Sequence, residues 1–300
     1  MSAGGRASER ACAGSGALWR YGLLTVGAFA TLLPFADMIL GALRTPADLL
    51  ARPPVYLPHH PAWGNFARAF TELPMGRWFL NSVVVTGAVT LIQLATSAAA
   101  GFAFAKYRFA LRGALFRMVL GAQMFPFFLL IIPVFFLLRF WPLAGGNDLT
   151  GNGGHGLLGS YAALILPFGV SWYGVFLMRQ FMLGVPDELL DAARIDGASE
   201  LGLLVRVALP LVKPALATLG VFVFIYQWNE VLWTMTVTRS APALQTVPVG
   251  IYLLRGAFND IQQHSLQQAA LVISVVPVVA LFLCLQRFYV RSLAMTGMVG

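Results

Sequence analysis

A run of polar and aromatic side chains lies inside an otherwise apolar part of this sequence. Its members are Tyr226, Gln227, Trp228, Asn229 and Glu230. Aromatic faces stack on the apolar faces of sugar rings, and the amides of Gln and Asn hydrogen-bond pairs of hydroxyl groups. The run therefore has the chemistry of a pathway site for a polyhydroxylated solute. Two other readings stay open, namely hydrogen bonding between helices and, for Trp228, anchoring at a membrane interface.

Residue types that support catalysis or metal binding are dispersed along the chain. The histidines lack the spacing of a metal site; they are His59, His60, His155 and His264. The glycine-rich stretch 145–156 lacks the Gly-Lys-Ser/Thr ending of a phosphate-binding loop, so we expect a flexible turn there. No Ser, His and Asp constellation lies within the apolar segments. We expect no catalytic residue, no metal site and no cofactor on this chain, and we do not expect an enzyme.

The composition is that of a membrane protein. Of the 300 residues, 58% are hydrophobic and 11% are charged, whereas soluble domains average about 25% charged residues. The missing charged surface implies that lipid is the solvent for much of the chain. The net charge of +8 comes from bases beside apolar segments, which is typical of polytopic proteins. We therefore expect the lipid bilayer, and no nucleic acid, as a partner.

Six segments are long enough to cross a bilayer, which needs about 20 helical residues. Four carry no charge, at 79–105, 118–138, 157–178 and 265–286. Two more, at 18–43 and 214–235, contain one acidic residue each, Asp37 and Glu230. The expected fold is all-α, a polytopic membrane helical bundle of about six transmembrane helices. Kinks are expected at the prolines inside these segments, which are Pro34, Pro126, Pro133, Pro167 and Pro277.

The bases also predict orientation. With the N-terminus inside, thirteen of the twenty Lys and Arg residues fall on the cytoplasmic side, which matches the excess of positive charge found there in membrane proteins. We therefore expect a multi-pass protein of the plasma (inner) membrane with both termini cytoplasmic. Residues 1–17 would form a cytoplasmic tail, and residues 18–300 the membrane domain.

A cytoplasmic loop of about thirty residues, at about 185–213, has the pattern of two short helices. Pro186 suits a first helical position, and Asp187 complements the positive end of the helix dipole. Gly197 suits the left-handed residue that ends a helix, and Ser199 can cap a second one. The second helix has apolar residues near helical spacing, Leu201, Leu204, Val205 and Ala208. The prolines at 210 and 214 are expected to close it.

This loop resembles the signature of the membrane subunits of binding-protein-dependent ABC importers. That signature is Glu-Ala-Ala, three residues, Gly, nine residues, Ile, one residue and Leu-Pro. The matching positions here are Asp191, Ala192, Ala193, Gly197, Val207, Leu209 and Pro210. Asp191 replaces Glu and Val207 replaces Ile, while every interval agrees. The chain is most similar to the carbohydrate branch, particularly its second, maltose-type permease. Further matching features are Asn81-Ser82, Phe104 to Phe109, Arg179-Gln180-Phe181, Ile195 to Ser199, Trp228-Asn229-Glu230 and Gln286 to Arg291.

The resemblance implies a function and a set of partners. In that family the loop forms coupling helices that dock on a separate ATPase subunit. It implies ATPase-coupling roles for Asp191, Ala192, Ala193, Asp196, Gly197, Leu209 and Pro210. The expected partners are an ABC ATPase dimer, which would bind ATP and Mg, a second homologous permease and an extracytoplasmic solute-binding protein. The chain would translocate a sugar or sugar-like solute.

Two alternatives remain open from the sequence. A secondary transporter driven by an ion gradient would need ionisable groups within the membrane, for which only Asp37 and Glu230 are candidates. An ABC importer permease for a non-sugar solute, such as a glycerol phosphate ester, would carry the same signature.

Overall fold

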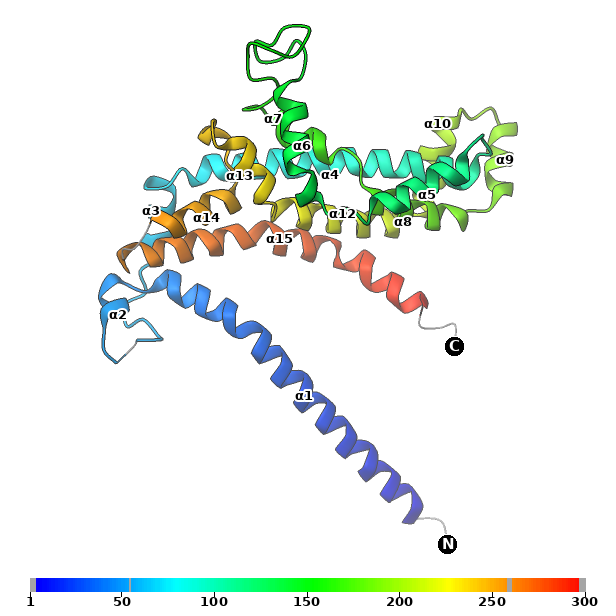
Figure 1. Ribbon diagram of the computed structural model, residues 1–300. Helices are drawn as coiled ribbons and strands as arrows, with labels where there is room; N and C mark the ends of the chain where they lie inside the picture. The colour runs from blue at the N-terminus through cyan, green and yellow to red at the C-terminus, as the bar shows by residue number, and fades with distance from the viewer. Residues whose placement is uncertain (1–3, 54, 258–260, 297–300) are drawn as a thin grey trace. The chain divides into compact units, whose positions relative to one another are not determined.

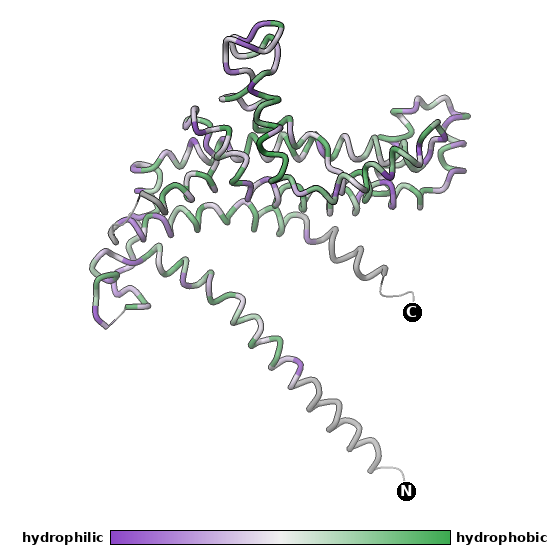
Figure 2. Tube along the Cα trace, viewed as in Figure 1, coloured by the Kyte–Doolittle hydropathy of each residue, from purple (hydrophilic) through white to green (hydrophobic). Residues whose placement is uncertain are grey.

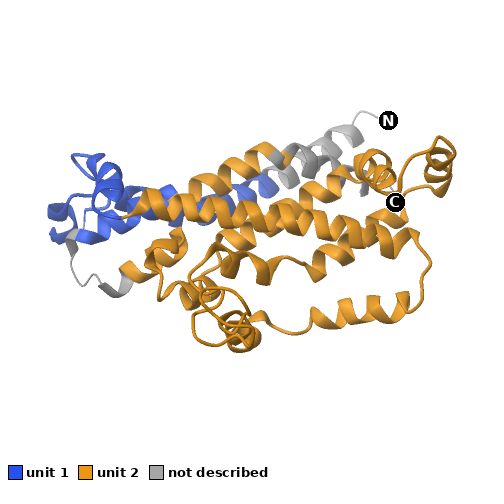
Figure 3. Ribbon diagram, turned by 90° about the horizontal axis from the view of Figure 1, so that it is seen from above, with its two compact units in different colours: residues 1–73, 256–273 blue, residues 74–255, 274–300 orange. Residues whose placement is uncertain are grey.

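The computed structural model describes residues 4–53, 55–257 and 261–296, which form helices and loops, with no β-strand in those ranges (Figure 1). The chain divides into two compact units (Figure 3). The first comprises residues 1–73 and 256–273, and the second comprises residues 74–255 and 274–300. The prediction of an all-α fold is therefore confirmed.

The first unit is built around the N-terminal helix α1. Its helices are α1 (Gly4–Leu43), α2 (Pro46–Leu50), α3 (Gly64–Thr71) and the first part of α15 (Ile261–Thr296). α1 is helical from Gly4 on, while its candidate membrane span begins at Trp19. The cytoplasmic tail at residues 1–17 stays a prediction. Asn65 donates from Nδ2 to the carbonyl of Ala42 at 2.8 Å, which satisfies a backbone acceptor at the end of α1.

The second unit contains the remaining helices. They are α4 (Met75–Lys106), α5 (Arg112–Ala122), α6 (Phe127–Arg139), α7 (Tyr161–Ile165), the 3₁₀ turn η1 (Leu166–Phe168), α8 (Trp172–Leu183), α9 (Asp187–Ile195), α10 (Glu200–Gly202), the π-helical η2 (Leu203–Ala208), α11 (Leu209–Leu211), α12 (Lys213–Trp228), α13 (Leu232–Thr238), the 3₁₀ turn η3 (Pro242–Leu244) and α14 (Val247–Ala257). Figure 2 shows apolar residues along α6 and α12 and hydrophilic ones around α9.

Three helices are long and apolar enough to cross a membrane unbroken, Trp19–Leu43, Met75–Lys106 and Gln263–Cys284. Three further segments pass the same test only as bent pairs. These are Arg112–Ala122 with Phe127–Arg139, Tyr161–Phe168 with Trp172–Leu183, and Glu200–Leu211 with Lys213–Trp228, bent by 104°, 45° and 87°. The total is up to six, in agreement with the expected number of spans.

The predicted spans at 118–138, 157–178 and 214–235 are each broken, and the kinks expected at Pro126 and Pro167 lie at the first two breaks. The first breaks between Ala122 and Phe127, where Pro126 lacks a backbone donor. The second becomes helical only at Tyr161 and breaks again after η1. The third ends at Trp228, because the side chain of Glu230 caps the new helix α13 instead of continuing α12.

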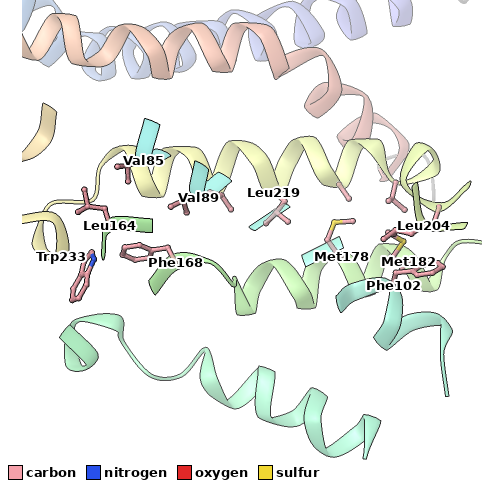
Figure 4. Close-up of a cluster of buried hydrophobic side chains, with 14 of the residues drawn as sticks. Val85, Val89, Phe102, Leu164, Phe168, Met178, Met182, Leu204, Leu219 and Trp233 are labelled. Carbon is pink, nitrogen blue, oxygen red and sulfur yellow. The ribbon is translucent and has the colours of Figure 1, made fainter. Parts of the chain in front are cut away.

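The core of the second unit lies where α4 packs along α8 and α12 (Figure 4). Val85, Val89 and Phe102 of α4 meet Met178 of α8 and Leu219 of α12, and all five are almost completely buried. These contacts bury apolar side chains between three of the segments that carry the membrane-spanning pattern.

The polar face of α4 supports the break before α8. Gln93 donates from Nε2 to the carbonyl of Phe168 at 2.7 Å, and the Thr96 hydroxyl donates to the carbonyl of Gly169 at 3.0 Å. A helix break frees backbone carbonyls that lipid cannot satisfy, so a neighbouring helix must supply the donors. This polar face of α4 thus packs against another helical segment.

Candidate functional site

The first helix of the 185–213 loop forms where the sequence predicts it, except that Pro186 is its N-cap residue and not its first helical residue. α9 starts at Asp187, one residue after Pro186, and ends in a left-handed turn at Gly197, whose φ is +83°. The Gly197 amide donates to the carbonyl of Arg194 at 3.0 Å, and the Ala198 amide donates to that of Ala193 at 2.9 Å. This pair of bonds is the Schellman motif, which favours glycine at the left-handed position. The loop therefore turns sharply between its two helices.

The second helix of the loop also forms where the sequence predicts it. The Ser199 hydroxyl accepts a hydrogen bond from the Gly202 amide at 3.2 Å, as a helix cap should. The helix then passes through the π-helical turn η2 and ends at Leu211, between Pro210 and Pro214, as expected. The chain bends by 87° before it continues as α12.

The seven residues with a predicted ATPase-coupling role lie on one loop and differ in exposure. Five are exposed, Asp191, Ala192, Asp196, Gly197 and Pro210, and two are half-buried, Ala193 and Leu209. Leu190 is only 1% exposed and holds α9 against the core. Leu203, Leu204 and Ala208 of the second helix are buried in the same core. The loop is thus anchored by apolar side chains of both helices while most of the signature faces outward.

Charged groups on the loop are paired with one another. Arg194 donates from Nη1 to Asp191 at 2.8 Å and lies 3.4 Å from Glu200 through Nε. The hydrogen bonds that Arg194 donates to Glu200 and Asp191 hold the pKa of its guanidinium above the usual range. The Asp191 carboxylate, which stands where the signature has Glu, is therefore fixed by an arginine of its own helix.

Apolar side chains are exposed beside these charges. Ile195 is 87% exposed, Leu201 69% and Val205 50%. All three lie in the loop itself, next to the small residues of the signature. Exposed apolar groups within a polar rim are typical of a protein interaction surface.

The run at residues 226–230 is divided between several environments. Tyr226 borders a cavity, whereas Gln227 and Trp228 are buried. The Trp228 indole donates to the carbonyl of Ser274 at 3.0 Å. Asn229 donates to the carbonyl of Ile225 at 2.7 Å, and the Glu230 carboxylate accepts from the first amides of α13.

The cavity beside Tyr226 has a volume of about 550 Å³ and lies at two of the helix breaks. Its wall comes from the α5–α6 junction, the η1–α8 junction and α12, and includes Gln123, Phe125, Trp172, Tyr173, Phe222 and Tyr226. Gln93 of α4 also reaches it. None of its described lining residues has an acidic or basic side chain. The wall combines aromatic faces with amide groups, which suits an uncharged polyhydroxylated molecule.

Sequence reasoning missed the roles of three residues that lie within matched motifs. Asn81 donates to the carbonyls of Ala243 and Gln245 at 2.9 and 2.8 Å, and so joins α4 to the η3 turn. Lys106 and Tyr107 contact the 185–213 loop, which is about eighty residues or more away in sequence. The sequence offered one signal for these three residues, namely that each lies in a segment similar to the importer family. Their partners could not be predicted, because the contacts join segments that are far apart in the chain.

Comparisons with known proteins agree with this architecture. The family described as "Binding-protein-dependent transport system inner membrane component" matches residues 94–295. The chain is 33% identical to the arabinooligosaccharides transport system permease protein AraQ of Halalkalibacterium halodurans, over 93% of this chain and 96% of that protein. It is 31% identical to the sulfoquinovosyl glycerol transport system permease protein SmoH of Agrobacterium fabrum, over 90% and 89%.

Two further comparisons extend this result. The sn-glycerol-3-phosphate transport system permease protein UgpE of Yersinia pestis is 31% identical, over 90% of this chain and 93% of that protein. A chain in the crystal structure of a bacterial ABC transporter that imports the acidic polysaccharide alginate shares the fold, with a TM-score of 0.73 at 22% identity, over 94% of this chain and 98% of that one. The protein therefore belongs to the family of binding-protein-dependent transport system inner membrane components and is a multi-pass permease of the inner membrane.

Proposed function

We propose that this chain is a permease subunit of an ATP-driven ABC importer for a neutral sugar or sugar-like solute, with both termini cytoplasmic. A separate ATPase dimer binds ATP and Mg²⁺ and drives the permease through the 185–213 loop. A second homologous permease completes the pathway, and an extracytoplasmic solute-binding protein delivers the solute. The proposed ATPase-coupling residues are Asp191, Ala192, Ala193, Asp196, Gly197, Leu209 and Pro210.

The observation that carries the coupling role is the exposed signature surface on a rigidly turned loop. Asp191, Ala192 and Gly197 are exposed, and Ile195 next to them is 87% exposed. Small residues allow a partner to approach the helix backbone closely, and an exposed Ile supplies apolar area for it to cover. A loop that only connected two spans would not require this surface.

The neutral character of the solute is inferred from the cavity. Moving a phosphate, sulfonate or carboxylate into an apolar site is costly unless a cation pairs with it. The described wall has aromatic and amide groups but no Lys, Arg or His. Among the relatives, the arabinooligosaccharide permease AraQ is named for a sugar of this kind. Within the run 226–230, Tyr226 lines the cavity, which supports a direct contact with the solute. The other four residues would shape the helix junction behind it.

The two alternative functions are less well supported. A glycerol phosphate ester, as in the name of UgpE, would lack a counter-charge in the described cavity wall. An ion-driven carrier needs ionisable groups free to exchange ions in the membrane. Asp37 is paired with Arg44 at 3.3 Å, and the Glu230 carboxylate accepts three hydrogen bonds at the start of α13.

Site-specific photo-crosslinking in native membranes tests the docking surface. A photoreactive phenylalanine analogue in place of Ile195 should give an adduct with an ATPase subunit. The same analogue in place of Leu91, which is 70% exposed on α4 inside a predicted span, is the control and should give no ATPase adduct. An Ile195 variant that inserts normally but forms no ATPase adduct contradicts the proposal.

A further inference from the structure

The C-terminal end of α4 binds the first helix of the 185–213 loop. Lys106, the last residue of α4, donates from Nζ to Asp187 Oδ1 at 2.6 Å and to the carbonyl of Val185 at 2.5 Å. The Lys106 side chain is only 6% exposed, whereas that of Asp187 is 75% exposed. Asp187 is the first residue of α9. A nearly buried ammonium with two oxygen acceptors therefore fixes the start of α9 to α4.

The next residue binds the second helix of the loop in the same way. The Tyr107 hydroxyl donates to the carboxylate of Glu200, which is the first residue of α10. Burial and the neighbouring Glu200 carboxylate raise the pKa of Tyr107, and the hydrogen bond from Tyr107 lowers the pKa of Glu200. The phenol thus remains a donor and the carboxylate an acceptor near neutral pH. The last residue of α4 and the residue that follows it therefore hold the N-terminal residues of both loop helices.

This end of α4 is itself held firmly. Arg112 and Arg179 both donate to the carbonyl of Phe104, at 2.9 and 3.3 Å through their Nε atoms. The Arg179 guanidinium also lies over the Phe116 ring, 4.2 Å from its centroid. Cations at a helix C-terminus complement the helix dipole. Because its last turn is held by these contacts, α4 can move as one piece when the loop pulls on its end, and the last turn need not unwind.

α4 also leads from the loop to the cavity. It is a 32-residue helix with no internal Pro, and its Gln93 both lines the cavity and bonds the carbonyl of Phe168. A rigid helix that contacts two sites can couple them when each site prefers a different position of the helix. The contacts at both ends of this path lie within the second unit.

We propose that Lys106 and Tyr107 form a clamp, here called the α4 clamp, through which movement of the 185–213 loop reaches α4 and the cavity. The proposal rests on the proposed function, in which an ATPase moves this loop. Lys106 and Tyr107 are positioning residues, because they contact neither ATP nor solute. Their loss should uncouple ATP hydrolysis from rearrangement of the cavity while leaving the ATPase bound.

The test uses the full complex, purified from native membranes with its ATPase and reconstituted in lipid nanodiscs. Cys12→Ser and Cys284→Ser remove the natural thiols, and Tyr226→Cys places a reporter in the cavity wall. The measurement is the change in maleimide labelling rate of this reporter when ATP and vanadate are added, together with ATP hydrolysis. When Lys106 and Tyr107 are unaltered, the labelling rate of the reporter should change clearly on addition of ATP and vanadate.

The double variant Lys106→Met with Tyr107→Phe keeps the apolar bulk of both side chains and removes their polar contacts. We expect it to retain the ATPase and ATP hydrolysis, while the ATP-dependent change in labelling falls roughly tenfold, as for the loss of charge-assisted hydrogen bonds. The single variant Lys106→Arg keeps the positive charge and should retain most of the ATP-dependent change in labelling rate. Arg108→Met, at the exposed neighbouring position, is the matched control and should behave as the unaltered chain.

Three results overturn the proposal. A double variant with an undiminished labelling change shows that the clamp transmits nothing. A double variant that no longer retains the ATPase shows that these residues build the loop and do not transmit its movement. An unaltered complex that contains no ATPase refutes the proposed function, and the clamp with it.

Discussion

Gln93 of α4 donates a hydrogen bond of 2.7 Å to the carbonyl of Phe168, the last residue before the break that leads to α8. The bond is buried, so its loss would leave a carbonyl without a donor in an apolar setting. We expect Gln93→Leu to lower stability by about 1–3 kcal/mol and the melting temperature in detergent by a few degrees. Leu91→Val, on the exposed side of the same helix, is the control and should change the melting temperature little. Equal melting temperatures for both variants would contradict this role.

The close approach of α4 and α8 depends on Gly101. A Cβ atom at this position would lie 2.6 Å from the Met178 Cβ and 2.8 Å from the Arg179 amide nitrogen. Gly101→Ala should therefore destabilise the fold by about 1–3 kcal/mol through overpacking. Gly87→Ala on the same helix meets no atom within 4 Å and should be neutral or slightly stabilising. Thermal unfolding of the two variants in one detergent compares them, and the reverse order would refute this packing.

The glycine-rich loop at 145–156 is organised by Asp148. Its Oδ1 accepts from the amides of Thr150 and Asn152 at 2.8 and 2.9 Å, and from the Thr150 hydroxyl at 2.7 Å. Asp148→Ala should increase hydrogen exchange of these two amides, because their acceptor is gone. Leu149→Ala, at a side chain 77% exposed, should not do so. Unchanged exchange in Asp148→Ala would show that the carboxylate does not hold the loop.

The same carboxylate predicts a pH dependence. The hydrogen bond from the Asn152 amide, followed by that from the Thr150 hydroxyl, lowers the pKa of Asp148 below 3.8. A depressed carboxyl pKa stabilises the folded loop above pH 3.8 and loses this contribution as the pH falls through the lowered value. Protection of the loop amides should accordingly be constant near neutral pH and decrease only in strong acid.

Solute selection should follow the charge of the cavity. In cells that depend on this chain for uptake, neutral oligosaccharides such as arabinotriose should compete for import, and sn-glycerol 3-phosphate should not. Phe125→Arg, at an exposed position of the wall, should reduce import of the neutral solute because it places an unpaired charge there. Strong competition by the phosphate ester, with none by neutral sugars, would reverse the assignment of solute class.

The features that the sequence predicted correctly are those set by local chemistry. The left-handed turn at Gly197 follows from the absence of a side chain, and the cap by Ser199 follows from its hydroxyl. The approximate number of spans follows from the lengths of the apolar runs. The importer signature needs only intervals along the chain, so the family could be predicted as well.

The helix breaks could not be predicted from the prolines alone. Pro126 and Pro167 lie at broken spans, whereas Pro34, Pro133 and Pro277 lie inside unbroken helices. Whether a span breaks depends on donors from other helices, such as Gln93 and Thr96, that satisfy the freed carbonyls. The contact of Lys106 with Asp187, 81 residues away, is equally non-local. Sequence patterning identified such residues as polar without giving their partners.

The most direct test of the central claim is copurification of an ATPase with the tagged chain from native membranes in mild detergent. The unaltered chain should bring down an ABC ATPase, and Gly197→Asp should lose it, since the left-handed turn at Gly197, whose φ is +83°, disfavours any side chain and the substitution adds a charge to the exposed signature surface. Gly113→Asp, at another exposed and open glycine outside the loop, should retain the ATPase. If the unaltered chain purifies without an ATPase while other membrane complexes stay intact, the importer account is wrong.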